Sequence, residues 1–197
     1  MASEILLIRH TSVEYPRGYC YGFSDIDVSE KFKIEAKKLK TRIDFFSPSK
    51  VISSPLKRCS LLAHELFDAS IITTNENLKE LNYGDWENKT WESIGVPEKG
   101  NWMYLNPSTK TPNGESFEDM KARVSAVFQN EITNYQNEKV AVVCHGGVIR
   151  AILSHVLNIP LESTLNFKIH YTGTVRLIKE HNNWKLADLD ACLPPRN

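Results

Sequence analysis

Five side chains that suit phosphate chemistry follow separate apolar runs of the chain. They are Arg9, His10, Arg58, Glu80 and His145. Guanidinium groups bind a dianionic phosphate through paired hydrogen bonds, and an imidazole that is largely unprotonated near neutral pH can attack phosphorus. A second imidazole can stabilise the equatorial oxygens, and a carboxyl group can protonate the leaving alkoxide. Together these residue types predict phosphoryl transfer from a phosphate monoester.

Two glycines and a threonine extend this set. Gly146 and Gly147 stand where a helix is expected to begin, so their N–H groups and the positive end of the helix dipole would face the same anion. Thr11 can offer its N–H or its hydroxyl to phosphate. The chemistry needs no metal ion, and the sequence has no metal-ligand spacing, so we expect neither a metal nor another cofactor.

Alternating strand and helix patterns predict the elements that would position these residues. Strands are expected at 4–8, within 47–54, at 70–74 and at 139–144, and helices at 29–46, 54–67, 116–136 and 147–157. This order predicts a mostly parallel sheet with helices on both faces. Ligands of such sheets bind outside the carboxyl ends of the strands, which is where the five side chains would converge.

Three serines are expected to cap these helices. Ser29 precedes the first helical pattern, and Ser54 precedes the second, with Pro55 at its first helical position. Ser116, followed three residues later by Asp119, has the spacing of a capping box.

The chain reads as one domain, residues 1–197, with an irregular middle. Residues 75–114 are rich in Trp, Asn, Gly and Pro, which is typical of a functional insertion, and we expect this segment to cover the site. Residues 172–180 and 183–189 predict a hairpin, and therefore antiparallel pairing near the C-terminus.

The composition excludes several classes of protein. The 197 residues are 41% hydrophobic and 24% charged, and Lys+Arg and Asp+Glu are equal at 24 each. Such a balanced chain has no general field to attract nucleic acid or an anionic membrane. The N-terminus does not read as a signal peptide, and no apolar run approaches a membrane span. We therefore expect a cytoplasmic monomer or homodimer whose partner is a small phosphomonoester.

The cysteines show no pairing or metal-binding pattern. They stand at 20, 59, 144 and 192. We expect reduced thiols, with a disulfide as the minority interpretation.

Four motifs, in matching order over about residues 1–160, resemble the histidine phosphatase superfamily, the phosphoglycerate-mutase-like group. They are LLIRHT at 6–11, SSPLKRC at 53–59, LKELNYGDWEN at 78–88 and VVCHGGVIR at 142–150. The resemblance implies a three-layer α/β/α sandwich with a mostly parallel central sheet. It also implies that His10 becomes a phosphohistidine and that Glu80 is the proton donor, and later the base towards water.

The resemblance further implies that Arg9, Arg58 and His145 form the phosphate pocket. Many members carry glycine at the position of Thr11, a departure that leaves the chemistry intact. Spacing alone does not choose Glu80 over Asp85 and Glu87, which are its main competitors as the acid. His64 and His155 are expected to be surface or core residues without a role.

The run GYCYGFSD at 18–25 resembles the α-ribazole phosphatase branch, whose members remove phosphate from a nucleotide of the cobalamin pathway. Tyr21 and Gly22 would then belong to the substrate side of the pocket. Aromatic residues could stack there on a bulky aromatic base, or could fill a core; they are Tyr19, Tyr21, Phe23, Trp102 and Tyr104. We expect α-ribazole 5′-phosphate as the substrate, with general sugar or nucleotide phosphates as the alternative.

Hydrolysis is favoured over mutase activity. Mutases of the family look longer than this chain and carry Asn six positions after the histidine, where this sequence has Pro16. A mutase must also keep water from the phosphohistidine, and this shorter chain is less equipped to do so.

Two rival functions remain open from the sequence. Cys144 and Arg150 have the C-x5-R spacing of cysteine-based phosphatases, although Val148 and Ile149 are bulky for a tight phosphate loop. A non-catalytic phosphate-ligand binder on the same fold is the other rival, and the presence of His10 and Glu80 argues against it.

Overall fold

A six-stranded sheet forms the centre of the protein, as shown by a computed structural model that describes residues 3–96, 102–135, 138–181 and 183–190. The strand order is β3-β2-β4-β1-β5-β6. Its members are β1 (Glu4–Arg9), β2 (Lys50–Ser53), β3 (Ile72–Thr74), β4 (Lys139–Cys144), β5 (Thr174–Glu180) and β6 (Asn183–Leu189). The first four strands are parallel, and β5 and β6 form an antiparallel hairpin next to β1. The mostly parallel sheet and the hairpin are therefore confirmed.

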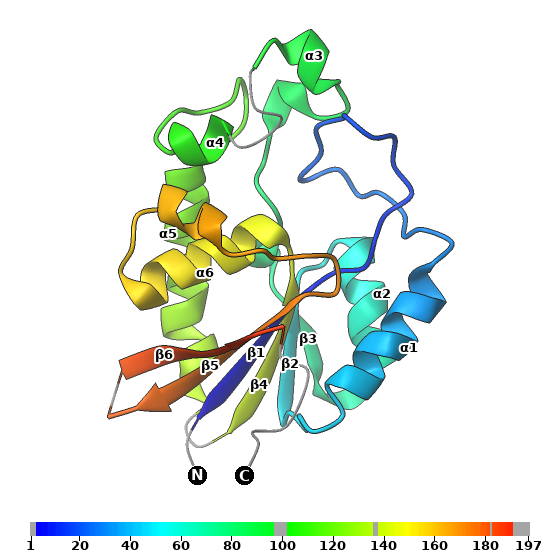
Figure 1. The fold of residues 1–197 in the computed structure, drawn as a ribbon, viewed down its shortest axis with the longest axis vertical. Helices are drawn as coiled ribbons and strands as arrows, with labels where there is room; N and C mark the ends of the chain where they lie inside the picture. The colour runs from blue at the N-terminus through cyan, green and yellow to red at the C-terminus, as the bar shows by residue number, and fades with distance from the viewer. Residues whose placement is uncertain (1–2, 97–101, 136–137, 182, 191–197) are drawn as a thin grey trace.

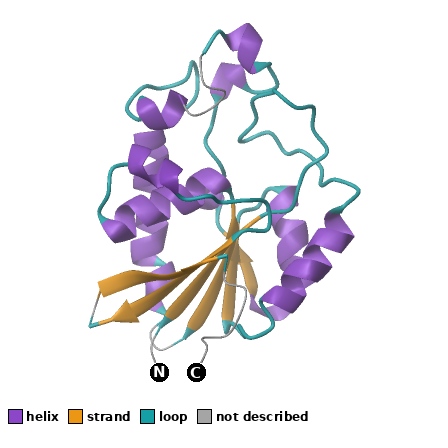
Figure 2. Ribbon diagram, viewed as in Figure 1, coloured by secondary structure: helices purple, strands orange, loops and turns teal. Residues whose placement is uncertain are grey.

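Helices cover both faces of this sheet (Figures 1 and 2). One face carries α1 (Phe32–Arg42) and α2 (Lys57–Leu66), and the other carries α5 (Phe117–Asn130) and α6 (Gly146–Leu157). Each face has its own cluster of buried apolar side chains. The structure is thus the predicted α/β/α sandwich.

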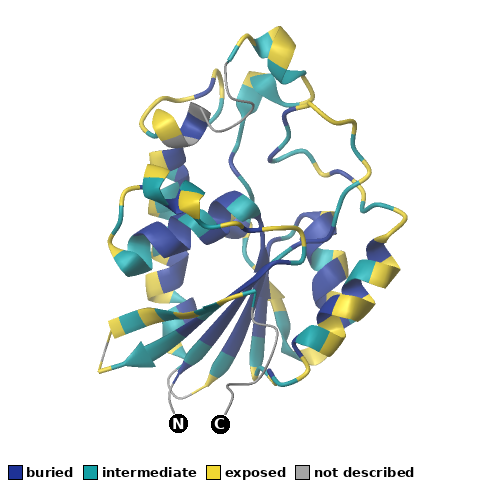
Figure 3. Ribbon diagram, in the orientation of Figure 1, coloured by how far each residue is buried: buried dark blue, intermediate teal, exposed yellow. Residues whose placement is uncertain are grey.

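The sequence of β1 explains why this strand lies in the middle. Ile5 and Leu7 pack into the cluster under α5 and α6, whereas Leu6 and Ile8 pack into the cluster under α1 and α2. Side chains of a strand alternate between faces, so an uninterrupted apolar run requires cover on both sides. Figure 3 shows the central strands as the most deeply buried part of the molecule.

One predicted helix cap is confirmed and two are wrong. Ser116 and Asp119 form the capping box of α5. Helix α1 begins after Lys31, and α2 begins after Leu56, and neither has a side-chain cap. Oγ of Ser29 lies 2.6 Å from the hydroxyl of Ser12 and accepts from the N–H of Lys31 at 3.3 Å, one residue before α1 begins.

The loop after β1 and the 75–114 segment lie together beyond the carboxyl end of the sheet, at the top of Figure 1. The segment is not wholly irregular, because it contains short helical turns. These are η2 (Glu76–Leu78), η3 (Gly84–Trp86), α3 (Trp91–Ile94) and α4 (Trp102–Leu105). Three further turns lie elsewhere: η1 (Ala69–Ile71), η4 (Ile132–Asn134) and η5 (Glu162–Asn166).

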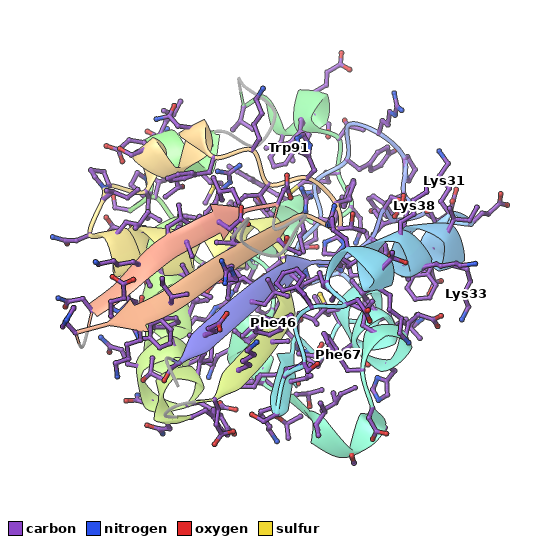
Figure 4. All side chains as sticks on the ribbon, turned by 60° about the horizontal axis from the view of Figure 1, so that its bottom comes forward. Lys31, Lys33, Lys38, Phe46, Phe67 and Trp91 are labelled. Atoms are coloured by element: carbon purple, nitrogen blue, oxygen red, sulfur yellow. The ribbon has the colours of Figure 1, made fainter. Side chains whose placement is uncertain are left out.

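The outer surface of α1 carries charged side chains that face solvent. Lys33 and Lys38 are exposed, and Figure 4 shows both at the rim of the molecule, away from the sheet. Phe46 is buried and Phe67 is partly buried on the sheet side of α1 and α2. Within the described residues, we find no helix with the length and apolar character needed to cross a membrane.

Candidate active site

Strand register brings the predicted residues together at the carboxyl end of the sheet. Arg9, the last residue of β1, pairs with Cys144 at the end of β4, and Ser53 of β2 pairs with Val143. A pocket of about 300 Å³ opens there. The predicted residues that line it include Arg9, His10, Arg58, Glu80, Gly146 and Gly147, whereas His145 lies behind this lining.

His10 is held in one orientation by the backbone around it. The backbone N–H of His10 donates to the Cys144 carbonyl at 3.0 Å, and Nδ1 of its ring lies 2.7 Å from the Thr11 carbonyl oxygen. A carbonyl can only accept, so Nδ1 carries the proton and Nε2 keeps its lone pair. Burial, followed by Arg58 and Arg9, holds the pKa of His10 well below its ordinary value. The ring is therefore neutral at pH 7.

Arg58 is fully buried and is held by neutral groups. Its Nη2 donates to the Gly22 carbonyl at 2.6 Å, and its Nη1 donates to the Ser24 carbonyl at 2.9 Å. Its Nε lies 3.3 Å from Nδ1 of His145. A buried cation without a carboxylate is costly, so such a site favours an anion.

Arg9 is positioned in a comparable way. Its Nη1 donates to the Ile169 carbonyl at 2.7 Å, and its guanidinium lies against Gly146. Its Nε is buried and finds no hydrogen-bond partner among the described residues. An unsatisfied buried donor of this kind is expected where an anion binds.

His145 sits beside His10, with the ring centroids 5.2 Å apart. Its Nδ1 accepts from Arg58, and its Nε2 lies 2.8 Å from Oγ of Ser54. Burial, followed by Arg58 and His10, holds the pKa of His145 well below its ordinary value. Ser54 therefore contacts His145, and its Oγ also accepts from the N–H of Leu56, the residue before α2, at 3.4 Å.

Glu80 follows η2 in the chain, and its side chain reaches the first turn of α6. Its carboxylate accepts from the N–H of Gly147 at 3.0 Å and from the N–H of Leu81 at 3.2 Å. A Cβ on Gly147 would lie only 2.3 Å from Oε1 of Glu80, so glycine is required for this approach. The Gly147 N–H is therefore used by Glu80, contrary to the expectation that it faces the anion.

The two competing acids are engaged elsewhere. Glu87 accepts from the N–H groups of Gly22, Phe23 and Ser24 at 2.9–3.1 Å, and so shapes the loop that holds Arg58. Asp85 is exposed and accepts from Asn113 at 2.9 Å. Neither lines the pocket, whereas Glu80 does.

Some predicted substrate-side residues lie apart from the pocket wall. Thr11 is fully buried, and its carbonyl orients His10. Gly22 acts through its backbone: a Cβ there would lie 1.8 Å from the Leu81 carbonyl oxygen. Phe23 faces Lys79 and Arg123 instead of the pocket. The side chains of Trp102 and Tyr104 lie outside the described residues.

Other residues line the pocket without having been predicted to do so. They are Tyr83, Trp91, Leu165 and Ile169, and they join the predicted Tyr19 and Tyr21; Arg150, named above only for the cysteine-based alternative, lines the pocket as well. Tyr83 belongs to the LKELNYGDWEN motif at 78–88, so its position near Glu80 in the sequence could have predicted that it lines the pocket. Trp91 sits on α3 at the loop end of the molecule (Figure 4). Nothing in the spacing of Leu165 and Ile169 pointed to the pocket.

Cys144, the nucleophile of the cysteine-based alternative, does not line the pocket. Cys144 packs into the core beneath α5 and α6, and burial raises the pKa of its thiol well above the ordinary value. Arg150 lines the pocket, and its Nη1 donates to the Thr164 carbonyl. Cys20, Cys59 and Cys144 are free thiols, while Cys192 lies outside the described residues. No group of three or more metal-ligating side chains occurs in the described part of the chain.

Comparison with known proteins finds similar phosphatases. Phosphoserine phosphatase 1 of Hydrogenobacter thermophilus is 28% identical over 170 residues, covering 83% of this chain and 81% of that protein. A mycobacterial glucosyl-3-phosphoglycerate phosphatase shares the fold, with a TM-score of 0.85 at 21% identity over 97% of this chain and all of that one. The α-ribazole phosphatase of Shigella flexneri has a TM-score of 0.83 at 22% identity, over 98% and 100% of the two chains. Residues 5–191 match the family described as the histidine phosphatase superfamily (branch 1), and the protein belongs to that superfamily.

Proposed function

We propose that the protein is a metal-independent phosphomonoesterase that works through a phosphohistidine at His10. One observation carries this proposal: a neutral, oriented imidazole lines the same pocket as the buried Arg58, the partly buried Arg9 and a carboxylate. These are the groups that an in-line displacement at phosphorus needs.

The first step transfers the phosphoryl group to the enzyme. Nε2 of His10 attacks phosphorus, the N–P bond forms, and the bond from phosphorus to the leaving oxygen breaks. Glu80, as the acid, gives its proton to that oxygen, so the product leaves as an alcohol. Arg9 and Arg58 would balance the charge on the equatorial oxygens.

The second step returns the enzyme to its starting state. Water attacks the phosphohistidine, and Glu80 now takes a proton from that water. The N–P bond breaks, and inorganic phosphate leaves with His10 regenerated. His145 would hold Arg58 in place in both steps, because its Nδ1 accepts from Nε of Arg58 and its Nε2 lies against Ser54.

The aromatic wall supports α-ribazole 5′-phosphate as a substrate. Tyr19, Tyr83 and Trp91 line the pocket beside the phosphate-binding groups, while the ring of Tyr21 lies over Arg58. Aromatic rings of this kind can stack on a planar heterocycle such as the base of α-ribazole. The gain from each stacked ring is about 0.5–1.5 kcal/mol beyond burial alone.

A small phosphate ester with a carboxylate is the second candidate. Arg150 lines the pocket in addition to Arg9 and Arg58, so the wall carries a third guanidinium that one phosphate does not require. A relative with 28% identity is named a phosphoserine phosphatase. A carboxylate near the phosphate would be complementary to this extra charge.

The test is phosphate release by the wild type and His10→Ala in the presence of a chelator. The panel contains α-ribazole 5′-phosphate, phosphoserine, 3-phosphoglycerate and sugar and nucleoside monophosphates. We expect the wild type to hydrolyse one class of these esters, and we expect that activity to be lost in His10→Ala. Release that His10→Ala leaves intact would contradict the phosphohistidine. Binding of these esters without any release would instead indicate a non-catalytic binder, and transfer between glycerate hydroxyls would indicate a mutase.

A further inference from the structure

Two tyrosines from distant parts of the chain meet over the two arginines of the pocket. The hydroxyl oxygens of Tyr21 and Tyr171 lie 2.9 Å apart, and either hydroxyl can donate. The ring centroid of Tyr171 is 4.2 Å from Cζ of Arg9, and that of Tyr21 is 5.7 Å from Cζ of Arg58. Each tyrosine therefore covers one guanidinium, and the hydroxyl contact joins the two.

This arrangement leaves the charge of both arginines available. Among the described residues, Arg123 and Arg176 form ion pairs with carboxylates, whereas no ion pair is found for Arg9 or Arg58. Backbone carbonyls and His145 hold them instead. The face of an aromatic ring attracts a cation without neutralising it. A ring can therefore fix a guanidinium that must still bind an anion.

The backbone fixes Tyr171 relative to β1. The N–H of Thr172 donates to the His10 carbonyl at 3.1 Å, and the N–H of Arg9 donates to the Gly173 carbonyl at 2.9 Å. The ring of Tyr171 lies 5.5 Å from that of His10. The 171–173 segment is thus tied directly to the strand that carries Arg9 and His10.

Tyr21 is fixed just as firmly from the other side. The N–H of Cys20 donates to the Lys89 carbonyl at 2.8 Å, and the N–H of Gly22 donates to Glu87 at 3.0 Å. Burial, followed by Tyr171, raises the pKa of Tyr21, so its hydroxyl stays protonated at neutral pH. The contact between the two hydroxyls thus links two anchored segments.

We propose that Tyr21 and Tyr171 act together as positioning residues that hold Arg9 and Arg58 in the orientation that binds a phosphoryl group. The inference rests on the proposed function in one respect, namely that these arginines hold the substrate phosphate. Every substrate shares that phosphate. Loss of the tyrosine pair should therefore weaken the binding of inorganic phosphate and of every ester by one common factor. A change at a residue that contacts the leaving group would instead affect the binding of each ester differently.

The experiment is calorimetric titration of inorganic phosphate into the wild type, Tyr21→Phe, Tyr171→Phe and the double variant. Phenylalanine keeps the ring and removes only the hydroxyl contact. We expect each single variant to raise the Kd about three- to tenfold, as for the loss of one hydrogen bond. The double variant should raise it no further, because both changes remove the same contact.

Tyr171→Leu extends the series by removing the ring over Arg9, and its Kd should rise by about tenfold or more. Tyr15→Phe is the matched control. Tyr15 packs edge-on against Tyr21, but its hydroxyl bonds to Asn88 and not to the pair. It should bind phosphate like the wild type. In parallel assays, kcat/KM of the pair variants should fall by the same factor for p-nitrophenyl phosphate and for the best natural ester.

Two results would overturn this inference while leaving the proposed function in place. One is an unchanged Kd in Tyr171→Phe and Tyr171→Leu, and the other is an additive effect of the two Phe changes. A different result would overturn the proposed function while leaving the positioning role of the tyrosines in place. If the series weakens phosphate binding as expected but the wild type hydrolyses no ester, the positioning role stands and the hydrolytic function falls.

Discussion

At the scale of single residues, the three carboxylates that the sequence offered as the acid occupy three different surroundings. Glu80 lines the pocket, Glu87 binds the amides of the 22–24 loop, and Asp85 pairs with Asn113 at the surface. Their spacing in the sequence did not distinguish them, because all three stand within eight positions of an irregular segment. The backbone of that segment decides which one reaches the pocket.

Glu80→Gln should separate the two chemical steps. Glutamine cannot protonate a leaving alkoxide, so hydrolysis of an alkyl phosphate should fall about 10²–10⁴-fold. p-Nitrophenolate leaves without a proton, so the first step with p-nitrophenyl phosphate should remain fast while the attack of water slows. Stopped-flow absorbance should then show a burst of about one p-nitrophenol per enzyme, followed by slow turnover.

Asp85→Asn is the matched control for this prediction, because it makes the same chemical change outside the pocket. It should show neither the burst nor the loss. If Glu80→Gln shows no burst and slows both esters equally, Glu80 is not the acid of the first step.

At the scale of elements, the junction of β4 and α6 determines how the site is assembled. Gly147 allows the Glu80 carboxylate to reach the first turn of α6, whereas a Cβ on Gly146 would meet Arg9 at an ordinary 3.5 Å. The two adjacent glycines therefore differ sharply in their tolerance of a methyl group.

Gly147→Ala should consequently lower kcat more than Gly146→Ala does. The added methyl displaces Glu80, and a displaced general acid loses about 10²-fold or more in rate. Gly146→Ala should stay within about tenfold, because its methyl group would make only an ordinary van der Waals contact with Arg9. Steady-state kinetics with an alkyl phosphate measures this difference. Equal losses in the two variants would contradict the steric argument.

The elements also show how far the sequence could predict the structure. The strands were predictable because β1 and β4 are continuous apolar runs, and the Ser116–Asp119 cap was predictable because it is local. The predicted cap at Ser54 is wrong because α2 begins only at Lys57, and Oγ of Ser54 lies against His145, 91 residues away. Tyr171 was missed for a similar reason, since its role depends on contacts across 150 residues.

At the scale of the whole molecule, burial of two histidines couples stability to pH. The pKa values of His10 and His145 in the folded protein lie well below the ordinary 6.5. The unfolded chain therefore binds more protons below pH 6.5. Stability should be greatest above 6.5 and should fall as the pH decreases from there towards the folded pKa values.

Urea unfolding between pH 7.5 and 5 should measure this loss. The slope should approach about 1.4 kcal/mol per pH unit for each histidine, above the range in which most carboxyl groups titrate. His10→Gln should remove its share of the slope. His64→Gln, a change at an exposed position of α2, should preserve the full slope. An unchanged slope in His10→Gln would contradict the neutral, buried state of His10.

The covalent intermediate is the central claim, and trapping it is the most direct measurement. The enzyme would be mixed with its best ester, quenched at alkaline pH to preserve the acid-labile N–P bond, digested and analysed by mass spectrometry. The account predicts a phosphoryl group on the peptide that carries His10, at up to one per enzyme, and none in His10→Ala. Phosphate on the Cys144 peptide, or turnover with His10 never modified, would contradict it.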